Sequence, residues 1–73
     1  MRTLADCEVG EVVKIVDMHG CRLAKRLAAM GLRVGDTVKV VSKLENGPLV
    51  VEHTLHGNRI AIGRGMAEKI YVL

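Results

Sequence analysis

Aromatic side chains are almost absent from this sequence: tryptophan and phenylalanine do not occur, and Tyr71 is the only tyrosine. A hydrophobic core must therefore be built from aliphatic side chains. Recognition of single-stranded nucleic acid relies on stacking rings, so this function is disfavoured. Grooves that bind proline-rich peptides are also lined with aromatic rings, which argues against that ligand class.

Cysteine and long apolar runs are scarce as well. Cys7 and Cys21 are too few for a disulfide scaffold, and we expect small buried thiols. No run approaches the roughly 20 apolar residues that a membrane span requires. The first segment, MRTLADCEVGE, does not resemble a secretion signal. We therefore expect a protein of the reducing cytosol that reaches a membrane only through a partner.

Groups suited to covalent catalysis are few. Ser42 is the single serine and falls in a predicted strand, outside any glycine-flanked elbow. Gly63-Arg64-Gly65 is too short to indicate a phosphate-binding loop. A chain of this length buries only about 60% of the surface of its unfolded form, which leaves little material for a catalytic cleft. We expect that the protein is not an enzyme.

Positive charge is concentrated in the middle of the chain. The net charge is +3, but residues 22–43 carry six basic side chains and one acidic side chain. Residues 1–21 carry two basic and four acidic side chains, and residues 44–73 are balanced. Such a cluster favours an acidic partner.

The central segment has the pattern of an amphipathic helix. Leu23, Leu27 and Met30 follow one another at i, i+4 and i+7, which predicts a helix over residues 21–30 with an apolar face. Gly31 fits the left-handed position that ends many helices. The opposite face carries the basic residues Arg22, Lys25 and Arg26.

The rest of the chain predicts short strands. We expect strands over residues 11–17, 37–44, 49–55, 59–62 and 70–73, joined in part by hairpin turns at 45–48 and 56–58. Short helical turns are expected at residues 3–6 and 64–69. Five strands with one inserted helix favour a mainly β fold, a small and partly open barrel, because closure removes exposed strand edges. Residues 1–73 are expected to form a single domain.

Four segments resemble the FeoA family of small cytosolic proteins of ferrous iron transport: GEVVKIV, RLAAMGLRVGD, GPLVVE and IAIGRGMAEKIYV. The second segment is the most specific, and its matching positions are Arg26, Leu27, Met30, Gly31, Leu32 and Gly35. Gly31 fits the helix cap, Leu32 can pack back on the helix, and Gly35 turns the chain toward a strand. The ending differs from the family pattern at residues 62–66, which weakens a surface role for this segment.

The resemblance implies an SH3-like barrel that docks on the cytosolic side of FeoB, a membrane transporter of ferrous iron with a GTPase domain. Similar domains occur fused to metal-dependent repressors, so the fold alone leaves the role open. Leu27, Gly31 and Gly35 are expected to be structural. The predicted partner-binding residues are Arg22, Arg26, Met30, Leu32, Arg33 and Val34. Core packing is the alternative for the three apolar residues of this set.

A metal-binding role is the main alternative. The weak candidate ligands are His19, Cys21, His53 and His56, because imidazole and thiolate bind Zn²⁺ and Fe²⁺. In a regular strand His53 and His56 point to opposite faces, so only a hairpin bend brings them together. A carrier or sensor of Fe²⁺ or Zn²⁺ and a nucleic-acid-binding regulator stay open, as does weak self-association. The docking role requires no cofactor.

Overall fold

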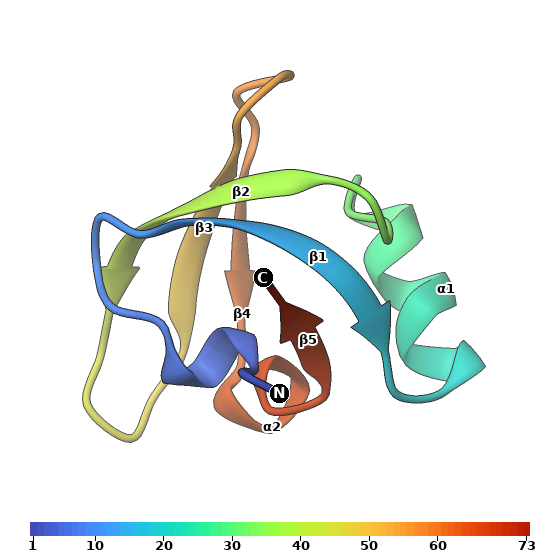
Figure 1. Ribbon diagram of the computed structural model, residues 1–73, viewed down its shortest axis with the longest axis horizontal. Coiled ribbons are helices and arrows are strands. Elements are labelled where there is room, and N and C mark those ends of the chain that lie inside the picture. Colours follow the sequence, from blue (N-terminus) through green and yellow to red (C-terminus); the bar gives the residue numbers. More distant parts are fainter.

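The computed structural model describes all 73 residues and contains a sheet of five antiparallel strands. In chain order the elements are η1 (Leu4–Asp6, a 3-10 turn), β1 (Val12–Met18), α1 (Cys21–Ala29), β2 (Thr37–Lys43), β3 (Leu49–His53), β4 (Arg59–Ile62), α2 (Arg64–Ala67) and β5 (Ile70–Val72). The strand order is β4-β3-β2-β1-β5, so the sheet curls into a partly open barrel with α1 at one side (Figure 1). The predicted mainly β fold with one inserted helix is confirmed.

β1 illustrates how the apolar pattern directs the sheet toward the core. Val13 and Ile15 are buried two positions apart, as expected for a strand with one face on the core. The pairing of β1 with β5 then shifts register between Ile15 and Asp17, and the next buried side chain is Met18. This irregularity returns an apolar side chain to the core at the point where β1 ends.

The core is aliphatic, as the lack of aromatic residues requires. Seventeen buried apolar side chains form one cluster, with contributions from every helix and strand. Burial of each large aliphatic side chain stabilises the fold by about 1.5–3 kcal/mol. The members are Leu4, Cys7, Val13, Ile15, Met18, Leu23, Leu27, Leu32, Val38, Val40, Leu49, Val51, Ile60, Ile62, Ala67, Ile70 and Val72.

The end of α1 confirms the glycine cap expected from the sequence. Gly31 has a left-handed φ of 92°, and its N–H donates to the carbonyl oxygen of Ala28 at 3.0 Å. The N–H of Leu32 donates to the carbonyl oxygen of Leu27 at 2.9 Å. These two bonds define a Schellman motif, in which the residue after the glycine packs back on the helix. Leu32 is accordingly fully buried.

The turn between α1 and β2 is fastened to β1. Gly35 has a φ of 101°, and its N–H donates to the carbonyl oxygen of Ile15 at 2.8 Å. The carboxylate of Asp36 accepts the N–H of Arg33 at 2.8 Å. The structural role predicted for Gly35 follows from this geometry, because a side chain would be strained at its positive φ.

β3 is shorter than predicted. The expected strand ran to Leu55, but β3 ends at His53 and a turn follows. The cause is the imidazole of His53, whose Nδ1 accepts the N–H groups of Leu55 at 3.1 Å and of His56 at 3.2 Å. A side chain that accepts backbone N–H groups two and three positions later competes with the strand ladder and forms a turn.

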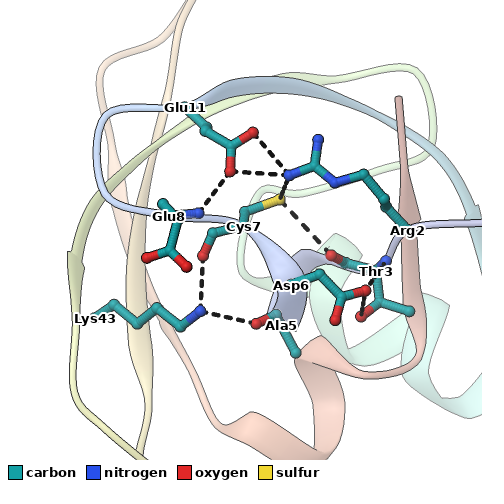
Figure 2. Close-up of polar contacts among 8 residues, drawn as sticks. All are labelled: Arg2, Thr3, Ala5, Asp6, Cys7, Glu8, Glu11 and Lys43. Carbon is teal, nitrogen blue, oxygen red and sulfur yellow. Dashed lines mark hydrogen bonds and ion pairs between the residues drawn. The ribbon is translucent and has the colours of Figure 1, made fainter.

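The segment before β1 is held against the sheet by two long basic side chains (Figure 2). Lys43 extends from the end of β2 and donates to the carbonyl oxygens of Ala5 at 2.9 Å and Cys7 at 2.8 Å. Arg2 forms an ion pair with Glu11 at 2.7 Å. Burial raises the pKa of the Cys7 thiol above its ordinary value. Cys7 is therefore the buried thiol that the sequence predicted.

The two ends of the described chain lie side by side at β5 (Figure 1). Thr3 forms an isolated bridge with Tyr71, and the N–H of Val72 donates to the carbonyl oxygen of Arg2 at 3.0 Å. The first residues thus continue the sheet beyond β5 and cover part of its edge.

Candidate docking surface

A groove of about 850 Å³ separates the N-terminal half of α1 from the segment that contains α2. Figure 1 shows the end of β1 and the start of β5 between these two helices. The N–H of His19 donates to the carbonyl oxygen of Lys69 at 2.8 Å, which joins the two walls. The lining residues are His19, Gly20, Arg22, Leu23 and Arg26 on one side and Gly65, Met66, Glu68 and Lys69 on the other.

The rim of the groove is basic. Arg22, Arg26 and Lys69 are exposed, and their side chains make no ion pair and no hydrogen bond within the chain. Glu68 is the one acidic lining residue, and its carboxylate lies 3.9 Å from the guanidinium of Arg64, one helical turn earlier. The groove therefore presents three cations without an intramolecular counterion.

The apolar part of the groove consists of Leu23 and Met66. Leu23 belongs to the core cluster and is 9% exposed, while Met66 is partly buried and packs against the same cluster. Both side chains pack on the core, so their exposed atoms form a fixed apolar surface in the groove.

The groove includes only part of the predicted partner-binding set. Arg22 and Arg26 line the groove, whereas Met30, Arg33 and Val34 lie beyond the C-terminal end of α1 and outside it. Met30 is 38% and Val34 is 54% exposed, so both are available for contact.

Leu32 is not available for contact. It is fully buried in the core, because the Schellman motif turns its side chain back onto α1. The alternative of core packing therefore holds for Leu32 and not for Met30 or Val34. Leu27 is also fully buried, as its predicted structural role requires.

The sequence interpretation missed the second wall of the groove. Met66 falls in the segment, residues 62–66, whose surface role is weakened by its departure from the family pattern, and Glu68 and Lys69 follow shortly after it. Their position depends on the pairing of β1 with β5, in which Met18 lies opposite Ile70. Contacts between residues so distant along the chain leave no local sequence pattern. The only local indication of this wall was an apolar residue, Met66, followed three positions later by a basic one, Lys69.

The weak metal candidates belong to two different parts of the chain. His19 and Cys21 are exposed around the start of α1. His53 and His56 are indeed brought together by the bend after β3, with ring centroids 4.6 Å apart and stacked. No group of three or more histidine, cysteine, aspartate or glutamate side chains is arranged to hold a metal ion. Cys21, unlike Cys7, departs from the expected buried thiol.

The histidine pair instead adjoins Asp36. Nε2 of His53 lies 3.3 Å from Oδ2 of Asp36, but this buried nitrogen makes no well-directed hydrogen bond. Burial opposes ionisation of Asp36, yet the N–H of Arg33 and the imidazole of His53 outweigh it and lower the pKa of the carboxyl below its ordinary value. Backbone N–H groups of the adjoining turns supply the hydrogen bonds that Asp36 and Nδ1 of His53 accept.

None of the helices is both long and apolar enough to cross a membrane.

The fold and the groove together define a small SH3-like barrel domain. Beside its main helix it has a surface with basic residues at the rim and two apolar side chains at the base. Residues 2–73 match the family described as the FeoA domain. A protein of Methanocaldococcus jannaschii with the provisional name Fe(2+) transport protein A is 42% identical over 74 residues, which covers 99% of this chain and 85% of that protein. The chain belongs to the FeoA family.

Solved structures agree with this assignment. The crystal structure of an iron uptake regulatory protein, FeoA, is 28% identical with a TM-score of 0.83, over 99% of this chain and 97% of that chain. The solution structure of FeoA from Chlorobium tepidum is 25% identical with a TM-score of 0.82, over 97% and 68%. A manganese-dependent transcriptional repressor has a TM-score of 0.88 over 99% of this chain and 35% of its own, but at 20% identity it shows the fold alone.

Proposed function

We propose that this protein is a non-catalytic, cytoplasmic accessory of ferrous iron uptake that docks on an FeoB-type transporter and regulates it. The observation that carries the proposal is the exposed and unpaired charge of Arg22 and Arg26 on α1, followed along the chain by the exposed apolar side chains of Met30 and Val34. The aliphatic core holds α1 and its following loop in place. The protein reaches the membrane through its partner.

The two kinds of side chain have different tasks in such a contact. Arg22, Arg26 and Arg33 increase the rate of encounter with an acidic surface, because complementary charge acts mainly on association. Met30 and Val34 lose water in the complex, and a desolvated apolar centre supplies most of the affinity of an interface.

Membership in the FeoA family supports the role in iron uptake. The relatives carry names that refer to Fe(2+) transport and to regulation of iron uptake. Docking requires neither a resident cofactor nor a catalytic side chain. No observation favours a second function strongly enough to propose one: the metal candidates form no set of three, and Tyr71 is the only aromatic residue for stacking on bases.

An amide-shift titration tests the proposal. Isotope-labelled protein is titrated with the transporter of its own organism in nanodiscs, with and without a GTP analogue, and separately with Fe²⁺ alone. We expect shifts or broadening at residues 22–34 with the transporter. No response to the transporter, combined with shifts of His19, Cys21, His53 and His56 by Fe²⁺, would replace docking by the metal-binding alternative.

A further inference from the structure

The groove between α1 and α2 combines two features that point to the chemistry of its ligand. Three cations surround it without intramolecular counterions, namely Arg22, Arg26 and Lys69. Between them lie the apolar side chains of Leu23 and Met66, both supported by the core. A ligand that satisfies both features carries carboxylates on either side of an apolar group.

The walls of the groove are already connected in the free protein. The hydrogen bond from the N–H of His19 to the carbonyl oxygen of Lys69 joins them, and the pairing of Met18 with Ile70 fixes the strands beneath. Little reorganisation is then required on binding, and preorganisation of this kind lowers the cost of association. Its volume of about 850 Å³ lies in the usual range for ligand sites.

Two other anionic partners fit the groove less well. A membrane surface requires exposed apolar side chains that can insert, but the large exposed ones, such as Val9, Leu44 and Leu55, do not line the groove. A nucleic acid requires stacking rings or uninterrupted positive charge, whereas the groove has no aromatic residue and carries Glu68. The mixture of cations, one carboxylate and an apolar floor suits a polypeptide.

We propose that the groove binds an acidic segment of the partner protein, with an aliphatic side chain seated between Leu23 and Met66 and carboxylates on Arg22, Arg26 and Lys69. The inference rests on the proposed function, because the segment is taken to belong to the transporter. It adds a second contact to the loop at Met30 and Val34, and it makes the α2 segment part of the interface.

Synthetic peptides test the chemistry directly. The probe is a short peptide of aspartate and glutamate with one central leucine, and the control peptide has serine in place of leucine. The leucine peptide is expected to shift amides of residues 19–26 and 65–69, and the serine peptide to bind several-fold more weakly. Equal binding of the two peptides would overturn the proposal that an aliphatic side chain of the ligand sits between Leu23 and Met66.

Matched variants test the position. Arg22→Glu with Lys69→Glu changes one residue of each wall, and binding of the leucine peptide is expected to weaken by at least about tenfold, as loss of two central charge contacts implies. Lys14→Glu with Lys25→Glu makes the same change of charge at exposed residues outside the groove and is expected to leave binding within about twofold, an effect of screened charge. Equal losses in both variants would show nonspecific attraction and overturn the site.

Separate binding measurements test the class of partner and the proposed docking on the transporter. Tighter binding of anionic lipid vesicles or of single-stranded DNA to the same amides would overturn the peptide assignment. Transporter binding that is equal for the wild type and the groove variant would overturn the groove while docking stands. A wild-type protein that binds the leucine peptide but not the transporter would retain the groove chemistry and reject both docking and the assignment of the segment to the transporter.

Discussion

His53 and Asp36 are neighbours across the end of the barrel, with Nε2 of the imidazole 3.3 Å from Oδ2 of the carboxylate. Nδ1 of the same ring accepts the N–H groups of Leu55 and His56, so the neutral ring carries its proton on Nε2. One buried side chain thus ends β3 and faces the loop that follows α1. The role assigned by this geometry is structural.

Replacement of His53 by alanine is therefore expected to destabilise the protein. The change removes a buried ring and the acceptor of two backbone N–H groups, and we expect a loss of about 2–4 kcal/mol in the free energy of unfolding. Urea denaturation measures this loss. His19→Ala is the control, because His19 is exposed, and its effect is expected to stay within about 0.5 kcal/mol. Similar losses in both variants would contradict the assigned role.

The ion pair of Glu11 predicts a dependence of stability on pH. The pKa of Glu11 lies below its ordinary value of 4.5, because its carboxylate accepts the N–H of Glu8 and pairs with Arg2. The stabilising contribution is fully present above pH 4.5 and is lost as the pH falls through the lowered folded-state pKa. Glu11→Gln removes this contribution.

Unfolding midpoints in urea, measured between pH 7 and pH 2.5, test the pH dependence. The difference between wild type and Glu11→Gln is expected to be constant near neutrality and to shrink below the ordinary pKa of 4.5. Glu45→Gln serves as the control, because the side chain of Glu45 makes no ion pair. A difference that grows as the pH falls would reverse the predicted sign.

Gly31 is expected to tolerate no β-branched side chain. Its φ of 92° is unfavourable for other residues, and a Cβ would approach Nδ2 of Asn58 to 3.1 Å. Gly31→Val is therefore expected to lose at least about 1–3 kcal/mol of stability by backbone strain. Gly65→Ala is the control, because a Cβ there meets no atom within 4 Å. Thermal midpoints that move equally in the two variants would exclude strain as the cause.

The basic face of α1 is expected to contribute to binding and not to folding. Arg22→Glu combined with Arg26→Glu should leave the thermal midpoint within a few degrees of the wild type, because neither side chain makes an intramolecular ion pair. Binding to the transporter should weaken, as measured by titration in nanodiscs. A large fall in the midpoint with unchanged binding by the folded protein would contradict this division.

Much of the fold could be predicted because it depends on local patterns. The spacing of Leu23 and Leu27 indicated α1, and Gly31 indicated its end with the cap that the structure contains. Short β-branched runs between turn residues indicated the strands. The early end of β3 could not be predicted in the same way, because it depends on the tautomer and acceptor geometry of a single histidine, His53.

The candidate site was only half predictable. Arg22 and Arg26 were visible as one face of a helix, but the wall opposite them depends on long-range pairing of β1 with β5. Leu32 was placed in the partner-binding set with core packing as the alternative, and the cap geometry decides for the core. Whether the residue after the capping glycine is buried depends on where the cap directs its side chain. The apolar spacing of the helix does not contain this information.

The hydrogen bond from Val72 to Arg2 has a consequence for protein engineering. Because these positions adjoin, a short flexible linker can join the two ends, and new ends can be opened in the exposed turn between β2 and β3. Such a circular permutant would keep every strand neighbour of the barrel while separating α1 and α2 from both ends. It would allow a fluorophore to be attached far along the chain from the groove.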